Sequence, residues 1–347
     1  MNLCIVGTGV VGKELSNLLH ENRLQINWKN LVFFGSKKST GQIIKYETES
    51  NQKIYTIRHL EKSDDFAEFD VALFCCSSAL SRQYAQWAIK QNCFVIDNSS
   101  AFRLLQNYPL IIPEINGDLI NTQTTKLVAN PNCSTILLCM VLHPLNKLAN
   151  IKQVIVSTYQ AASGAGKYGM SELQKQTEES CTGDGTVKTT DFFGRQYIHN
   201  LFSHNSNIDG DSGYNEEELK MIFETDRIMG IPVCATCVRV PVFRSHCESV
   251  HIQFDKQVSL HDIRQSIQEF NGLKLQDDIT NNQFPEPINT EKKWDIEVGR
   301  IRYDMIDPTF KTVTLFLSGD QLLKGAALNS YQILDLWGKK KRINIFV

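Results

Sequence analysis

Four short apolar runs alternate with amphipathic segments over the first 130 residues, and no other feature restricts the fold as strongly. The runs are LCIVG (3–7), LVFFG (31–35), VALFC (71–75) and CFVID (93–97). Such continuous runs are typical of strands buried on both faces of a parallel sheet. Between the first two, one helical face is predicted by the spacing of Val11, Leu15, Leu18 and Leu19. The repetition of strand and helix predicts an α/β chain with an N-terminal, Rossmann-type doubly wound domain.

Beyond residue 150 the pattern changes to longer segments in which apolar and polar residues alternate. These segments are IKQVIVSTYQ (151–160), CVRVPVF (237–243), SVHIQFD (249–255) and TVTLFLSGD (312–320). They predict an antiparallel or mixed sheet with helices on one face, which is an α+β arrangement. Residues 178–215 are rich in Gly, Asn, Asp and Ser and are predicted to form a long loop.

Two domains follow from this change of pattern. A helix predicted at 322–337 is apolar on one face and could return to the first domain. We therefore expect a first domain of residues 1–130 and 323–347 and a second domain of residues 131–322.

The charge and the cysteines exclude several classes of protein. A formal net charge of −2 argues against broad contact with nucleic acid or anionic lipid, so any anion must be bound locally. No apolar run approaches the ~20 residues of a membrane span, and Met1 is followed directly by a predicted strand, so a cytoplasmic location is expected. The ten cysteines are scattered, which favours reduced thiols. Cys234 and Cys237 have CxxC spacing without a second ligand pair, and no metal is predicted.

Gly7, Gly9 and Gly12 form a G-x-G-x-x-G pattern between a predicted strand and a predicted helix. Glycines at these positions allow a tight turn and let a pyrophosphate approach the helix N-terminus. The pattern predicts a dinucleotide site, and the alternative is a tight turn without a ligand. The residues expected to contact the cofactor are Gly7, Thr8, Gly9, Val10, Val11 and Gly12.

The segment GSKKSTG, which follows the second predicted strand, decides between the two nicotinamide cofactors. An NAD enzyme usually has an acidic residue there for the ribose hydroxyls, and this segment has none. Ser36, Lys38 and Ser39 can instead supply hydrogen bonds and positive charge to a 2′-phosphate, so NADP is predicted. The alternative is that the lysines are simply solvated.

Cys133 is the candidate nucleophile. In NPNCST the proline disfavours a helical conformation at Asn130, and the apolar residues after Ser134 have helical spacing. Cys133 is therefore predicted to lie at a helix N-terminus, where the helix dipole and N–H groups favour a thiolate and can stabilise an oxyanion. The alternative is an ordinary buried thiol.

A second segment, RVPVFRSH, strengthens the catalytic interpretation. It carries Arg239 and His246 seven positions apart. A histidine can transfer a proton near neutral pH, and a guanidinium can bind a carboxylate through two parallel hydrogen bonds. Together with Cys133 and a dinucleotide site, these residues predict the oxidation of an aldehyde through a thioester.

Taken together, these segments resemble the aspartate-semialdehyde dehydrogenase family. The resemblance runs in order from residue 6 to residue 333, through VGTGVVG, GSKKSTG, IDNSSAFR, NPNCST, VSTYQAASGAGKYGM, GYNEEELKM, RVPVFRSH, VGRIR and LKGAALNSYQI. It departs from the family at CCSSA (75–79), where a glycine-containing turn is usual. The resemblance implies that the first domain binds NADP and that the second is a catalytic and dimerisation domain, in a homodimer.

The resemblance also implies a role for each site residue. Cys133 is similar to the nucleophile and His246 to the acid/base, with Gln160 orienting the acyl-enzyme and Asn132 in the same turn. The substrate would be held by Arg239 at its α-carboxylate and by Glu217 at its amino group. Phosphate would be held by Arg103 and Lys220. The register of Glu217 within three consecutive glutamates is open by one position, and Arg103 and Lys220 could be surface charges.

The predicted reaction is the NADP-dependent interconversion of L-4-aspartyl phosphate and L-aspartate 4-semialdehyde plus phosphate, in lysine, threonine and methionine biosynthesis. A first alternative is N-acetyl-glutamyl-phosphate reductase, whose cysteine usually lies in a Gly-Cys-Tyr context, unlike NPNCST. A second is a catalytically silent, dinucleotide-binding regulatory protein.

Overall fold

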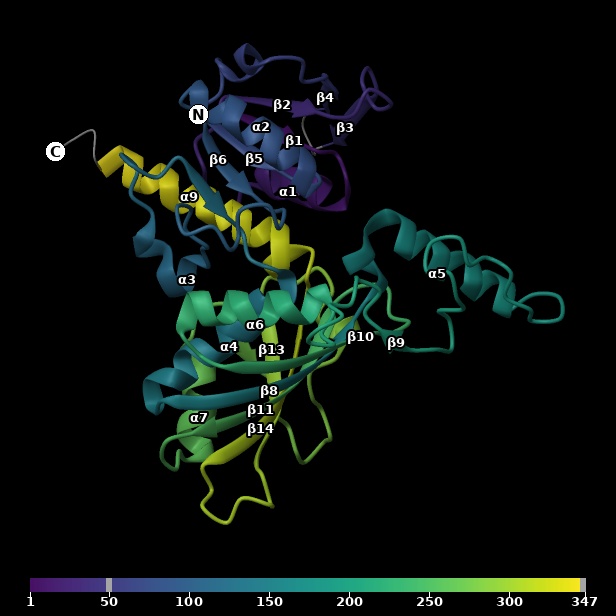
Figure 1. Cartoon of the computed structure of the whole chain (residues 1–347), viewed down its shortest axis with the longest axis vertical. Coiled ribbons are helices and arrows are strands. Elements are labelled where there is room, and N and C mark those ends of the chain that lie inside the picture. The colour runs from purple at the N-terminus through teal and green to yellow at the C-terminus, as the bar shows by residue number, and fades with distance from the viewer. Residues whose placement is uncertain (48–51, 344–347) are drawn as a thin grey trace. The chain divides into compact units, whose positions relative to one another are not determined.

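The computed structural model describes residues 1–47 and 52–343, and the chain divides into two compact units (Figure 1). The first unit consists of Met1–Pro131 and Ala326–Val347, and the second of Asn132–Gly325. Each unit is built around its own sheet.

The first unit contains a parallel five-stranded sheet with the order β2-β1-β5-β6-β7. Its strands are β1 (Asn2–Val6), β2 (Asn30–Phe34), β5 (Val71–Phe74), β6 (Phe94–Asp97) and β7 (Leu127–Ala129). The helices of the unit are α1 (Val10–Glu21), α2 (Ser78–Lys90), the single turn α3 (Pro113–Asn116) and α9 (Leu328–Ile343). The Rossmann-type prediction is confirmed, and all four residues of VALF are buried, as their unbroken apolar character predicts.

An antiparallel pair, β3 (Ile43–Glu47) and β4 (Gln52–Thr56), was not predicted. Its residues have little burial, and its alternation is irregular, so no periodic signal marks it in the sequence. Short 3₁₀ turns lie at Ser63–Phe66 and Gly117–Leu119.

The turn between β1 and α1 requires glycine at two positions. Gly7 has φ +108°, and a Cβ atom there would lie 2.3 Å from the carbonyl oxygen of Cys75. A Cβ atom at Gly12 would lie 2.1 Å from the carbonyl oxygen of Gly7. The turn therefore closes only because both residues lack a side chain.

The second unit contains a mixed seven-stranded sheet with the order β12-β13-β14-β11-β8-β10-β9. Its strands are β8 (Ile151–Gln160), β9 (Phe202–Ser203), β10 (Val233–Arg239), β11 (His246–Phe254), β12 (Leu273–Leu275), β13 (Ile296–Tyr303) and β14 (Thr312–Gly319). Its helices are α4 (Cys133–Leu148), α5 (Gly166–Ser180), α6 (Glu216–Met229), α7 (Leu260–Glu269) and α8 (Pro287–Thr290), with a 3₁₀ turn at Ala162–Ala165. The predicted mixed sheet is confirmed.

Helices α4, α6 and α7 lie along one face of this sheet (Figure 1). The burial of β8 follows that arrangement, since Val154 and Val156 are buried while Ile155 is 45% and Tyr159 39% exposed. The face with Ile155 and Tyr159 is contacted by α8 at the β14 side, where the Thr290 hydroxyl lies 2.7 Å from the Ser318 hydroxyl. An apolar sheet face of this kind is a candidate contact surface.

Three sequence predictions are wrong in extent. The strand predicted at 237–243 ends at Arg239, because Pro241 lacks the amide hydrogen that a strand pairing needs. The loop predicted at 178–215 begins after Ser180 and is interrupted by β9. The helix predicted at 322–337 starts as a π-helical turn, Leu323–Ala327, and continues as α9 to Ile343.

Across residues 1–47 and 52–343, no helix has the length and apolar character that a membrane crossing requires.

Candidate active site

Cys133 is the first residue of α4, as predicted. Asn132 caps the helix, and its Oδ1 atom accepts hydrogen bonds from the amides of Ser134 (3.0 Å) and Thr135 (3.2 Å). Cys133 is half-buried, whereas Cys139 on the same helix is fully buried. The half-exposed position at a capped N-terminus favours the nucleophile over the alternative of a core thiol.

The amides at the start of α4 are largely engaged. Besides the two amides bound by the Asn132 side chain, the amide of Asn132 donates to Glu224 on α6 at 2.6 Å. These N–H groups are occupied, so they contribute less to an oxyanion than an uncapped helix start would. Negative charge that develops near Cys133 must be met mainly by other donors.

Glu217 joins three of the predicted site residues. One carboxylate oxygen accepts from the side-chain amides of Asn132 (2.8 Å) and Gln160 (3.2 Å), and the other contacts the Lys220 ammonium at 3.1 Å. Burial alone would raise the pKa of this carboxyl. The Lys220 cation, His204 and the Asn132 hydrogen bond outweigh burial and hold its pKa well below the usual range. Glu217 is therefore a fixed negative charge beside Asn132 and Gln160.

Gln160, the last residue of β8, has one side-chain atom that lacks a protein partner. Its amide nitrogen donates to Ser134 Oγ at 2.7 Å and to Glu217. A carboxylate only accepts hydrogen bonds, so the amide nitrogen must face Glu217 and the amide oxygen must face away. That oxygen, Oε1, is buried and has no hydrogen-bond partner among the described residues. A buried acceptor of this kind is available to a donor from outside the protein, such as water or a bound molecule.

His246 and Arg239 are both bound to the main chain of Ala161, the residue directly after β8. The Ala161 amide donates to Nδ1 of His246 at 3.0 Å, and the Ala161 carbonyl accepts from Nη1 of Arg239 at 3.2 Å. Because Nδ1 of His246 accepts a hydrogen bond, the proton of the neutral ring is on Nε2. Burial, and next the nearby Arg239 cation, lower the pKa of His246 to about 3 against the opposing effect of Glu217. His246 is thus neutral at rest, with a donor at Nε2.

Two glycines leave room at the reacting groups. A Cβ atom at Gly164 would lie 2.9 Å from Nη1 of Arg239 and 3.0 Å from Nε2 of His246. A Cβ atom at Gly325 would lie 2.8 Å from Cβ of Cys133. The guanidinium and the imidazole therefore border the same space beside Gly164. Gly325 packs against the nucleophile. The charge of Cys133 also acts on Arg239 electrostatically.

Buried His246 and partly buried His204 predict a specific pH dependence of stability. Burial lowers the pKa of His246 to about 3 and that of His204 to about 4, from a usual value near 6.5. Below pH 6.5 the unfolded chain binds protons that the folded chain does not, so the free energy of unfolding falls as the pH falls toward 4. We expect each histidine to contribute about 2 kcal/mol to the loss of stability at pH 5 relative to pH 7.5.

Urea unfolding of the wild type, His204→Asn and His246→Asn at both pH values measures this contribution. Each variant should lose less stability on acidification than the wild type. An equal loss in all three proteins would contradict the burial of neutral imidazoles.

The predicted cofactor residues lie in the first unit, around a hollow of about 530 Å³. Gly7, Thr8, Ser36 and Ser39 line this hollow, while Lys38 does not and its neighbour Lys37 does. Gly9 is the N-cap of α1, Val10 and Val11 form its first turn, and Gly12 is buried beneath Gly7. Cys76 and Ser77 of the CCSSA segment also line the hollow, and sequence reasoning missed His59, Leu60, Leu80 and Tyr84.

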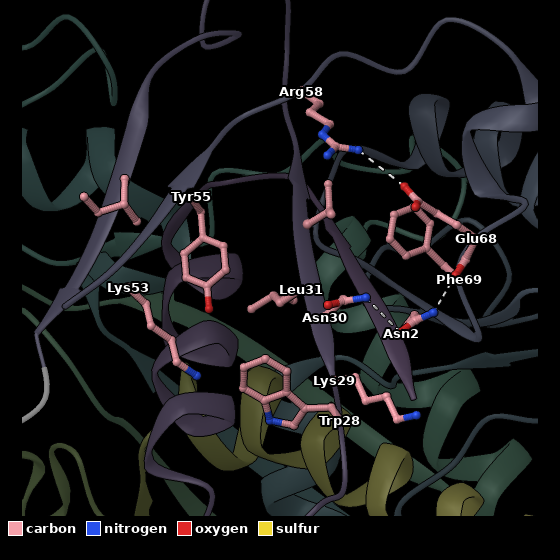
Figure 2. Close-up of a pocket in the computed structure, with 12 residues that line it drawn as sticks. Asn2, Trp28, Lys29, Asn30, Leu31, Lys53, Tyr55, Arg58, Glu68 and Phe69 are labelled. Atoms are coloured by element: carbon pink, nitrogen blue, oxygen red, sulfur yellow. Dashed lines mark hydrogen bonds and ion pairs between the residues drawn. The ribbon is translucent and has the colours of Figure 1, made fainter. Parts of the chain in front are cut away.

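A second hollow in the first unit, of about 480 Å³, lies between β2 and β4 and contains none of the predicted site residues (Figure 2). Lys53, Tyr55 and Trp28 lie on one side of the strand that carries Leu31, and Arg58 and Glu68 on the other. Arg58 pairs with Glu68 at 3.3 Å, and the Lys53 ammonium lies 4.8 Å from the centre of the Trp28 ring. The lining has no glycine turn and no helix N-terminus, so it lacks the features that hold a dinucleotide.

The two predicted phosphate ligands belong to different units. Arg103 lies in the first unit, is 9% exposed, and donates from Nη2 to the Asn98 carbonyl at 2.9 Å. Lys220 lies in the second unit beside Glu217. In residues 1–47 and 52–343, no three His, Cys, Asp or Glu side chains are arranged to hold a metal ion.

Residues that sequence reasoning missed in the second unit are Ala161, His204, Asn205 and Gly164. Gly164 lies within the quoted AASGAG segment, so its position was noted without a role. Ala161 acts through its main chain, for which no side-chain signal exists. His204 and Asn205 lie in the segment that was predicted only as loop.

Comparison with known proteins covers nearly the whole chain. Residues 2–123 match the family described as semialdehyde dehydrogenase, NAD binding domain, and residues 142–324 match semialdehyde dehydrogenase, dimerisation domain. The chain is 38% identical to an aspartate-semialdehyde dehydrogenase of Prochlorococcus marinus, over 97% of this chain and 95% of that protein. It is 37% identical to one from Aquifex aeolicus, over 97% and 98% of the two chains.

A solved structure gives the same result. The crystal structure of aspartate semialdehyde dehydrogenase II from Vibrio cholerae superimposes with a TM-score of 0.89 at 32% identity, covering 96% of this chain and 97% of that one. The same Vibrio protein has also been solved in complex with ASA. The similarity extends through both units of the chain.

Proposed function

The chain belongs to the aspartate-semialdehyde dehydrogenase family, and from this we propose that it interconverts L-4-aspartyl phosphate and L-aspartate 4-semialdehyde plus phosphate with NADP as cofactor. The observation that carries the proposal is the clustering, in the second unit, of a helix-terminal thiol, a neutral imidazole, a buried guanidinium and a fixed carboxylate. These groups match the thiol chemistry and the charges of that substrate. The route would serve lysine, threonine and methionine biosynthesis.

Cys133 is the proposed nucleophile. In the biosynthetic direction its sulfur bonds to the acyl carbon of aspartyl phosphate, the bond from that carbon to the phosphate oxygen breaks, and a thioester results. A bound nicotinamide cofactor supplies the hydride that reduces this thioester. The resulting thiohemiacetal then collapses, releasing the aldehyde and the Cys133 thiolate.

His246 supplies a hydrogen-bond donor in this scheme. Its Nε2–H can donate a hydrogen bond to the oxygen that becomes negative when the tetrahedral centre forms, and this bond is released when the centre collapses, so the neutral ring keeps its proton. Because the amides at the start of α4 already form hydrogen bonds, the Nε2–H group of His246 must stabilise much of the negative charge on that oxygen. A neutral imidazole is the right form for it, and burial keeps the ring neutral.

The substrate's two charged groups have separate complements. The Arg239 guanidinium suits the α-carboxylate, since it can form two parallel hydrogen bonds. Glu217 and the unpartnered Oε1 atom of Gln160 are two acceptors for the α-ammonium. Arg103 and Lys220 are proposed to bind phosphate, and Arg103→Ala and Lys220→Ala are each expected to raise the KM for phosphate.

The glycine turn and the hollow beside it fit a dinucleotide, because side chains at Gly7 and Gly12 would fill the cradle. Ser36 and Ser39 offer hydroxyls to a 2′-phosphate, and Lys37 is the lysine that lines the hollow. We therefore assign the cationic contact to Lys37 in place of Lys38.

Lys37→Ala should raise the KM for NADP about 10-fold or more and leave the KM for NAD nearly unchanged, since a contact to an ionised group is lost. Lys38→Ala is the matched control and should have a smaller effect. Initial rates with both cofactors measure the difference. A larger rise in the KM for NADP in Lys38→Ala would assign the cationic contact to Lys38, as the sequence analysis predicts.

A homodimer is proposed from the match of residues 142–324 to a dimerisation domain. The apolar sheet face around Ile155 and Tyr159 is the surface that would be covered. Sedimentation of the wild type and of Ile155→Lys tests this, with dissociation expected in the variant. A monomeric wild type would contradict the proposal.

The central experiment mixes the purified protein with aspartate semialdehyde, phosphate and NADP and follows NADPH by its absorbance. Turnover supports the proposed reaction. Turnover only with N-acetyl-glutamate semialdehyde would favour the related reductase, and silence with both aldehydes would favour a nucleotide-binding regulatory protein.

A further inference from the structure

A short loop after β9 contacts both sides of the proposed substrate site. Within this loop, residues 204–206, Oδ1 of Asn205 accepts from Nε of Arg239 at 3.1 Å. Oγ of Ser206 accepts from the amide of Glu217 at 3.3 Å. One loop thus contacts both the proposed carboxylate-binding residue and the proposed ammonium-binding residue.

His204 holds this loop in place. Its own amide donates to the Cys237 carbonyl at 2.9 Å, and its Nδ1 atom accepts from the Ser206 amide at 3.3 Å. Burial, and next the Arg239 cation, keep the pKa of His204 low, at about 4. A neutral ring with an accepting Nδ1 atom therefore fixes the path of the chain on either side of Asn205.

The contact with Asn205 determines how Arg239 can bind a carboxylate. A guanidinium can form two parallel hydrogen bonds through Nε and one terminal nitrogen, or through its two terminal nitrogens. The Nε–H group is engaged by Asn205, and one hydrogen of Nη1 is engaged by the Ala161 carbonyl. The pair that remains for a carboxylate is on Nη1 and Nη2, which have no other protein partner among the described residues.

The remaining edge of Arg239 faces the proposed acid/base. Nη1 of Arg239 and Nε2 of His246 both lie about 3 Å from the Cβ position that Gly164 leaves empty, at 2.9 Å and 3.0 Å respectively. A carboxylate bound to the two terminal nitrogens therefore lies on the side of the guanidinium nearest His246. Binding through Nε would direct the carboxylate toward Asn205 instead.

We propose that Asn205 is a positioning residue that restricts Arg239 to its two terminal nitrogens and thereby sets the orientation of the substrate's α-carboxylate. The inference rests on the proposed function, because it concerns how a short amino-acid aldehyde or acyl phosphate is oriented. Without Asn205, the Nε edge becomes available and the guanidinium can turn. Binding of the carboxylate must then also hold the guanidinium in place, so the productive complex is less stable and kcat/KM falls.

Asn205→Ala tests the proposal. The KM for aspartate semialdehyde should rise about 10- to 100-fold, the range expected when a hydrogen bond to a charged group is lost. The KM values for phosphate and NADP should stay within about 2-fold of the wild type. Asn207→Ala is the matched control, since Asn207 lies in the same segment, donates to Glu216 at 2.9 Å and makes no contact with Arg239. It should leave all three constants unchanged.

A substrate analogue separates positioning from a general structural role. 3-Aminopropanal is aspartate semialdehyde without its α-carboxylate, so Asn205 should have nothing to orient when this aldehyde is used. The ratio of kcat/KM between wild type and Asn205→Ala should be near 1 with the analogue and large with the full substrate. An equal loss with both aldehydes, or no change with either, would overturn the proposal. An inactive wild type would instead refute the proposed function.

Discussion

Replacing Cys133 with alanine is expected to lower kcat by at least about 10⁴-fold while NADPH still binds with wild-type affinity. The sulfur is the atom that carries the acyl group, and removal of a covalent nucleophile leaves only binding and charge stabilisation. Nucleotide affinity should survive, because the glycine turn and the hollow of about 530 Å³ belong to the first unit, whereas Cys133 belongs to the second. Stopped-flow measurement of NADP reduction gives kcat, and a fluorescence titration with NADPH gives the nucleotide affinity.

Cys181→Ala is the matched control for this prediction, since Cys181 is an exposed thiol after α5. It should retain wild-type kcat. If Cys133→Ala retained more than about 1% of kcat, the thioester route would be wrong. If it lost nucleotide affinity as well, the role of Cys133 would be structural.

A single methyl group at Gly164 is expected to lower kcat/KM by about 10²- to 10³-fold with little change in thermal stability. The added Cβ atom would lie within 3.0 Å of both the Arg239 guanidinium and the His246 imidazole, so at least one of them must move. Displacement of a reacting group by about 1 Å is enough to cost 100-fold. Gly164 has no positive φ, so alanine itself is compatible with its backbone.

Gly210→Ala controls for the loss of a glycine in the same unit. A Cβ atom at Gly210 would meet no heavy atom within 4 Å, and its φ is not positive. Steady-state kinetics and thermal unfolding of both variants make the comparison. Unchanged kcat/KM in Gly164→Ala would show that the space beside His246 is not used by the substrate.

The first unit could be predicted largely from local sequence. The strands of its parallel sheet are short, mainly apolar runs, and the glycine pattern at positions 7, 9 and 12 lies within one strand-turn-helix segment. The start of α4 could be predicted for the same reason, because Pro131 and Asn132 determine it locally. Which of Lys37 and Lys38 lines the hollow could not be predicted. It depends on the turn that forms when the amides of Ser39 and Thr40 both donate to the Ser36 carbonyl.

The contacts of the second unit were beyond local prediction. Glu217 meets Gln160 and Asn132 across 57 and 85 positions of sequence, so only the folded chain brings them together. The neutral state of His246 likewise depends on burial, which a lone histidine in the sequence does not reveal. The resemblance named Gln160, Asn132 and Glu217 by position, and the structure adds which of their atoms form hydrogen bonds and that Oε1 of Gln160 has no protein partner among the described residues.

Ala161 binds the imidazole through its amide and the guanidinium through its carbonyl. The distance between the His246 imidazole and the Arg239 guanidinium is therefore set by the main chain of one residue. Exchanging side chains cannot lengthen it. Enzymes of this design should resist conversion to aldehydes one methylene longer by point substitution, and residues inserted or deleted next to position 161 should be needed to change the chain length they accept.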